Sequence, residues 1–139
     1  MKGKLRVLTI ILVAGSASAG SAQDQDVGQV NFRMSCASCH GAEGKGNGPV
    51  SGQLKVPPPD LTVLAKKNNG VFPVSRVYEI IDGRQQVMAH GTRDMPFWGF
   101  QYSLEQRVQG HPATAIDPDV IVRMRILSII DYLSRFQQK

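Results

Sequence analysis

The sequence predicts a fold of helices joined by long loops, and three segments point to it. Residues 118–136 carry apolar side chains at the period of an α-helix, and Asp117 stands before them as a cap, followed by a proline in the first turn. Residues 73–82 fit a second helix, which Gly83 would end. Residues 41–52 contain five glycines and one proline, a composition typical of a loop. The length of 139 residues suits a single domain.

Apolar positions also define the two helices at the ends of the domain. The first helix is expected to start at Asp24 or Asp26, because either carboxylate can cap it. Gly28 would cost that helix about 1 kcal/mol relative to alanine, and close approach of another helix would compensate for the loss. The last helix is expected to bury one stripe without a chemical role, made of Val122, Ile126, Ile129, Leu133 and Phe136 and widened by Ile130 and Tyr132.

A shorter element is expected in the middle of the chain. Pro57-Pro58-Pro59 forces an extended segment, and Asp60 directly after it can cap a short helix over residues 61–67. Asn69-Gly70 would end that helix, since both residues favour turns.

The first 22 residues have the order of a secretory signal peptide. Three basic residues precede an almost wholly apolar run at residues 7–14, and cleavage is expected after Ala19 or Ala22. The run is shorter than the roughly 20 residues that a membrane-spanning helix needs. We therefore expect a periplasmic protein whose residues 23–139 form one domain. Loss of the three basic residues lowers the formal charge from +5 to +2, so the composition does not indicate nucleic-acid binding.

Cys36-Ala37-Ser38-Cys39-His40 is the most specific motif in the chain. Two cysteines separated by two residues and followed by histidine are typical of c-type haem attachment. Residues three apart share one face of a helical turn, so both sulfurs can reach one edge of a porphyrin. His40 would then offer an imidazole nitrogen to the iron. The motif therefore predicts one covalent haem c, held by Cys36 and Cys39.

Other uses of a cysteine pair are less well supported. A structural zinc ion needs four ligands, whereas the chain has two cysteines, and His90 and His111 lie twenty-one positions apart. A thioredoxin-like pair would follow a strand, and no strand-like run precedes the motif. A plain disulfide across two residues would close too small a loop to stabilise the fold much.

Met95 is the predicted sixth ligand of the iron. It lies between polar residues and Pro96, in a segment expected to be a loop rather than part of a helical stripe. Methionine is a soft, neutral donor, and Met/His ligation raises the reduction potential of haem iron. Met88 and His90 remain alternatives. Met34 is too close to the cysteines to cross the ring, and Met124 belongs to the last helix.

These motifs, in their order, resemble the small class I c-type cytochromes. The resemblance rests on the cysteine–histidine motif, the glycine-rich run ending in Gly48-Pro49, Met95-Pro96, and the terminal helix with Tyr132-Leu133. It covers residues 26–136. Residues 57–59 and the segment from Gln101 to Pro112 do not map onto the family's minimal pattern. His111 is expected to be an exposed loop residue.

The resemblance implies an all-α, small cytochrome c fold whose helices and long loops wrap around one covalently bound haem. The first and last helices would cross near Gly28, Phe32 and Tyr132. The Pro49 carbonyl would accept the ring N–H of His40 and fix its tautomer. Trp98 would lie near the haem or serve as an ordinary core residue.

Filled axial positions on both sides of the iron favour electron transfer over chemistry at the metal. We therefore expect a periplasmic one-electron carrier rather than an enzyme. This carrier would meet redox partner proteins and would contact membranes only through the complexes of those partners. A dedicated cytochrome subunit of a redox complex is the first alternative. A haem sensor or peroxidase-like protein with a labile sixth ligand is the second. A docking rim is hypothesised from the basic residues of the middle segment, namely Lys45, Lys55, Lys66, Lys67 and Arg93.

Overall fold

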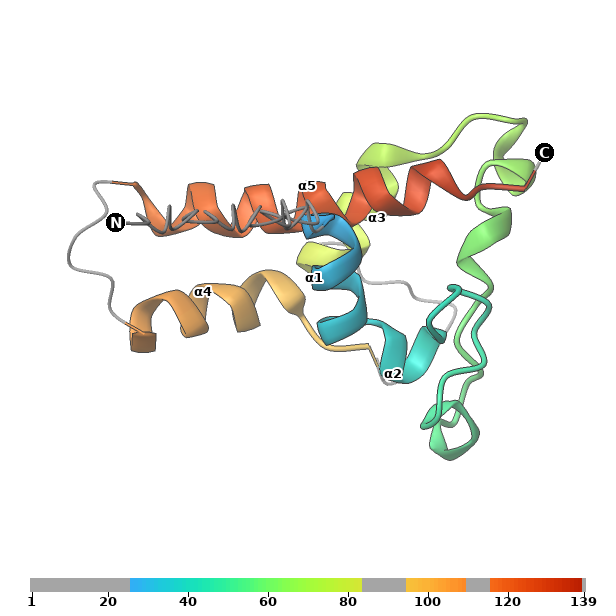
Figure 1. The fold of residues 1–139 in the computed structure, drawn as a ribbon, viewed down its shortest axis with the longest axis horizontal. Helices are drawn as coiled ribbons and strands as arrows, with labels where there is room; N and C mark the ends of the chain where they lie inside the picture. The colour runs from blue at the N-terminus through green and yellow to red at the C-terminus, as the bar shows by residue number, and fades with distance from the viewer. Residues whose placement is uncertain (1–25, 84–94, 110–115, 139) are drawn as a thin grey trace, which may run out of the picture.

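The computed structural model describes residues 26–83, 95–109 and 116–138, and the regular structure in these ranges is helical, without strands (Figure 1). The predicted all-α fold is thus confirmed. The α-helices are α1 (Val27–Ser35), α2 (Ala37–His40), α3 (Val74–Asp82), α4 (Trp98–Gln109) and α5 (Pro118–Arg135), and the 3₁₀ turns are η1 (Ser51–Gln53), η2 (Leu61–Val63) and η3 (Lys66–Asn68). Within the described ranges, we find no helix with the length and apolar character needed to cross a membrane.

The first and last helices cross at the predicted place. Asp26 caps α1 by accepting a hydrogen bond from the Gln29 N–H at 3.1 Å. A Cβ atom at Gly28 would overlap the Ser128 carbonyl oxygen of α5, so only glycine allows this approach. Phe32 is fully buried there, and its ring centroid lies 5.5 Å from that of Tyr132.

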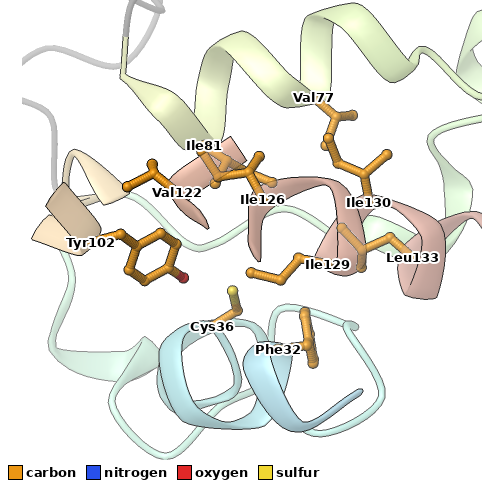
Figure 2. Packing of buried hydrophobic residues seen from close by; sticks show 10 residues of the cluster. All are labelled: Phe32, Cys36, Val77, Ile81, Tyr102, Val122, Ile126, Ile129, Ile130 and Leu133. Carbon is orange, nitrogen blue, oxygen red and sulfur yellow. The ribbon is translucent and has the colours of Figure 1, made fainter. Parts of the chain in front are cut away.

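The stripe on α5 forms the centre of the core, as predicted. Asp117 caps the helix by accepting a hydrogen bond from the Asp119 N–H at 2.9 Å. Phe136 differs from the rest of the stripe, because it ends the helix and is only partly buried. The buried members of the stripe are Val122, Ile126, Ile129, Ile130 and Leu133 (Figure 2).

The predicted helix over residues 61–67 is replaced by the two turns η2 and η3. An α-helix would need the Ala65 N–H to donate to the Leu61 carbonyl. The side-chain amide of Gln137 stands between these groups instead, accepting from the Ala65 N–H at 3.0 Å and donating to the Leu61 carbonyl at 2.8 Å. The tail of the chain thus takes the hydrogen bonds of the expected helix.

The helix α3 has the predicted extent, whereas α4 was not predicted. Gly83 ends α3 with a φ of 98°, a left-handed conformation that suits glycine. Residues 101–112 were left without an assignment, and most of them extend α4 beside the first half of α5 (Figure 1). The signal in the sequence was weak because α4 is apolar on two sides: Tyr102 is buried, while Phe100 and Val108 are exposed.

Candidate functional site

The cysteine–histidine motif forms the junction of α1 and α2. Cys36 ends α1, donating its N–H to the Phe32 carbonyl at 2.8 Å, and its own carbonyl accepts the His40 N–H at 2.9 Å. Cys36, Cys39 and His40 are therefore carried on one helical turn, as the spacing predicts. The two cysteines do not form a disulfide with each other; Cys36 is buried and Cys39 partly buried.

The Cys36 sulfur points into the hydrophobic core, between Tyr102 and Ile129 (Figure 2). Burial raises the pKa of this thiol to about 12, and the nearby Arg125 guanidinium opposes the shift. The thiol is therefore neutral in this apolar setting.

The loop after α2 is held against the helical turn by its own backbone. Gly46 donates its N–H to the His40 carbonyl at 2.8 Å, and Gly48 donates to the Cys39 carbonyl at 3.0 Å. A Cβ atom at Gly48 would overlap the carbonyl oxygens of this turn. The glycine-rich composition thus lets the loop satisfy the carbonyls that the short helix leaves open.

The imidazole of His40 is buried and oriented by one hydrogen bond. Its Nδ1–H donates to the carbonyl of Pro59 at 3.2 Å. Because a neutral imidazole has a single N–H, the prediction that Pro49 accepts this bond is wrong. Pro49 belongs to the loop that is pinned to the α2 backbone, whereas the extended 57–59 run passes beside the ring. That run, which the sequence left unexplained, therefore supplies the acceptor.

The electrostatics of His40 suit a metal ligand. Burial lowers the pKa of the imidazole, and the hydrogen bond to Pro59 opposes this shift only in part. The ring is therefore held neutral, and with Nδ1 occupied its Nε2 lone pair remains for coordination.

The candidate sixth ligands of the iron differ in how far they are buried. Met95 is partly buried and packs against the cluster that contains Cys36. Met34 and Met124 are 73% and 62% exposed, so neither side chain faces the core. Met88 and His90 lie outside the described residues, as do Arg93 and His111. Met95 as the iron ligand stays a prediction.

Surface lysines and Trp98 complete the set of predicted residues. The four lysines of the hypothesised docking rim that the structure describes, Lys45, Lys55, Lys66 and Lys67, are exposed. Lys45 forms an ion pair with Glu43 at 3.0 Å.

Trp98 packs against the core cluster, with its ring centroid 5.5 Å from that of Tyr102.

Sequence reasoning missed Tyr102, which faces Cys36, and the ion pair of Arg125 and Glu105 next to that ring. Tyr102 is 1% exposed, and its hydroxyl points toward the Cys36 sulfur (Figure 2). The guanidinium of Arg125 lies 3.9 Å from the centroid of the Tyr102 ring and 2.7 Å from the carboxylate of Glu105. Tyr102 and Glu105 belong to α4, and Arg125 lies between apolar residues of α5. The sequence offered one signal for this group of residues: Arg125 is a basic residue at the edge of the buried apolar stripe of α5.

The donor set fits haem c. Two thiols three residues apart stand on one turn, and a neutral, oriented imidazole follows them directly. A thioether packs against the same cluster. The hydroxyl of Tyr102 is buried without a hydrogen-bond partner among the described residues. Zinc would need a fuller set of ligands, and the described part of the chain gathers no group of three or more His, Cys, Asp or Glu side chains that could hold a metal ion.

Comparison with known proteins gives one family. The family model described as "Cytochrome C oxidase, cbb3-type, subunit III" matches residues 23–109, which is more than half of the chain. Neither the curated proteins nor the solved structures give a match.

Proposed function

The chain belongs to the family of cbb3-type cytochrome c oxidase subunit III, a family of c-type cytochromes, and from this premise we propose that it is a periplasmic one-electron carrier with a single covalent haem c. Membership of the family indicates haem-based electron transfer and the use of redox partner proteins.

The observation that carries the proposal is the environment of His40. A buried imidazole whose N–H is taken by the Pro59 carbonyl can coordinate through its other nitrogen without rotating. Cys36 and Cys39 on the same turn would hold the porphyrin through thioether bonds, and Met95 would bind the second axial position. The Met95 segment lies far from the motif in sequence but packs against the same cluster.

The roles of the residues follow from these positions. When bound, haem c supplies reversible exchange of one electron at its iron, without making or breaking bonds in a substrate. His40 and Met95 would keep the same ligation in both oxidation states, which limits rearrangement. Phe32, Ile129 and their neighbours exclude water from the Cys36 side of the site. We propose no enzymatic activity for the chain on its own.

Expression of the full chain in a bacterium that exports and matures c-type cytochromes tests the proposal. The expected product is periplasmic, retains its haem after denaturation, and has a weak far-red absorption band from methionine–iron ligation. Met95→Ala should keep the covalent haem, lose that band, lower the reduction potential and bind carbon monoxide quickly when reduced.

Met124→Ala is the matched control, because Met124 is exposed on α5. An unchanged spectrum in the Met95 variant would move the axial ligand to Met88 or His90. Wild-type protein that is exported but carries no covalent haem would refute the proposal as a whole.

A dedicated subunit of an oxidase complex is the second candidate, and the match to the oxidase subunit III family favours it. Separation of native cells into periplasm and salt-washed membranes distinguishes the two. A carrier should appear in the soluble periplasmic fraction, whereas a permanent subunit should stay with the membranes and copurify with its oxidase.

A further inference from the structure

A partly buried ion pair joins α4 to α5 beside the candidate site. Arg125 and Glu105 are 2.7 Å apart, and their side chains are 20% and 32% exposed. The Nε atom of Arg125 is buried and has no hydrogen-bond partner among the described residues. Such a pair is screened by solvent less than surface pairs are, so its charges act over a longer distance.

The positive member of this pair is directed toward Cys36. The guanidinium stacks on the Tyr102 ring at 3.9 Å, and the hydroxyl of the same ring points at the Cys36 sulfur (Figure 2). A guanidinium is a fixed positive charge in proteins, so Arg125 places such a charge one aromatic ring away from that sulfur.

We propose that Arg125 and Glu105 set the reduction potential of the haem in opposite directions, Arg125 raising it and Glu105 lowering it. The inference rests on the proposed attachment of haem at Cys36. Oxidation of a haem iron adds one positive charge to the site. A fixed guanidinium nearby opposes that added charge, whereas a carboxylate favours it. Both residues act as positioned charges and neither coordinates the iron.

Two residues of α4 fix the position of Arg125. Tyr102 and Glu105 both face α5. The ring of Tyr102 stacks on the Arg125 guanidinium, and the carboxylate of Glu105 forms an ion pair with it. Helix α4, which lies within the residues that the family model matches, thereby fixes the position of a charge beside the proposed haem site.

Spectroelectrochemical titration of the holoprotein tests the proposal with Arg125→Gln and Glu105→Gln. The first variant should lower the potential and the second should raise it, each by a severalfold change in the equilibrium constant for reduction. Arg125→Lys should recover part of the loss, since it restores the charge without the planar stacking. Arg123→Gln and Asp131→Asn are matched controls, because both residues are exposed on α5.

Opposite shifts separate an electrostatic role from a structural one, because loosening of the α4–α5 contact would move both potentials the same way. Shifts of equal sign, or shifts no larger than those of the controls, would overturn the inference. If Arg125→Gln does not fold, the expected rise in Glu105→Gln still decides the matter. Wild-type protein without haem at Cys36 would refute the proposed function, whereas haem-bearing variants with unchanged potentials would refute this inference alone.

Discussion

The helical turn that carries Cys36, Cys39 and His40 is stabilised by local backbone hydrogen bonds. The helices α4 and α5, which pack next to this turn, are joined to each other by side-chain contacts. On the first side, the loop of residues 41–50 donates N–H groups to the α2 carbonyls. On the second side, an ion pair and a stacked ring connect residues about 20 positions apart. The residues proposed to hold the haem are therefore placed by a short stretch of chain, and the charges around them are placed by the tertiary fold.

Replacement of Cys36 by serine should have the largest effect, because it would remove one of the two covalent bonds proposed to hold the haem. If the proposal holds, we expect loss of most of the covalently bound haem and a large loss of folded protein, since a porphyrin would supply apolar bulk to a small core. Haem staining of denatured protein and the mass of the purified chain measure the result. Ser38→Ala, an exposed change within the same motif, is the control. Cys39→Ser should behave like Cys36→Ser, and full haem retention in either variant would contradict the proposed attachment.

Gly28→Ala tests the contact between the two sides where α1 crosses α5. The added Cβ would overlap the Ser128 carbonyl, which is backbone and cannot rotate away. We expect a loss of about 1–3 kcal/mol in the free energy of unfolding, in spite of alanine's better helix propensity. Denaturant titration measures it. Gly52→Ala is the control, because nothing lies within 4 Å of the added atom and the change should stay within about 0.5 kcal/mol. Equal stability of the two variants would mean that the helices can separate at low cost.

Gln137→Ala should have a smaller effect, because Gln137 ties the tail of the chain to the middle segment rather than to the site. Its amide donates to the carbonyls of Leu61 and Leu133 and accepts from the Ala65 N–H. Loss of these bonds should cost about 1–2 kcal/mol of stability, with the reduction potential unchanged. Thermal unfolding followed by circular dichroism measures it, with the exposed Gln53→Ala as the reference. A shifted potential would show that the 61–68 segment helps to place the haem.

The weakest expected effect is the pH dependence at Asp26. The pKa of its carboxyl is lowered, first by the hydrogen bond from the Gln29 N–H and also by Arg135. A lowered folded-state pKa gives stability that is present above the ordinary value of about 4 and is lost as the pH falls through the lowered value. Asp26→Ala should therefore be slightly less stable than wild type at neutral pH and equal to it in strong acid. Denaturation curves across that range measure the difference. A constant difference at all pH values would mean that the carboxylate's charge contributes nothing.

Elements with a local signal were predicted well. Asp117, Pro118 and the apolar stripe located α5, and Gly83 located the end of α3. Gly28 indicated close approach of another helix, and α5 makes that contact. In each case the residue type strongly favours one structural role. Asp117 caps a helix, Gly83 ends a helix in a left-handed conformation, and Gly28 leaves room for the backbone of another helix.

Elements that depend on distant residues were predicted poorly. The expected helix over residues 61–67 failed because Gln137 takes its hydrogen bonds. The acceptor for His40 is Pro59 rather than Pro49, which the resemblance to class I cytochromes implied, and no local feature of the sequence distinguishes one proline carbonyl from the other. Helix α4 went unrecognised because its outer face is as apolar as its inner face.

The order of residues along the chain by itself determined the two thiols, the histidine beside them and the helical class, because each depends on neighbours within one or two turns. The tertiary structure alone decided which carbonyl orients His40, and which charge stands beside Cys36. Those contacts join segments separated by 19 positions or more, and hydrogen bonds and Coulomb forces depend on distance in space rather than on distance along the chain.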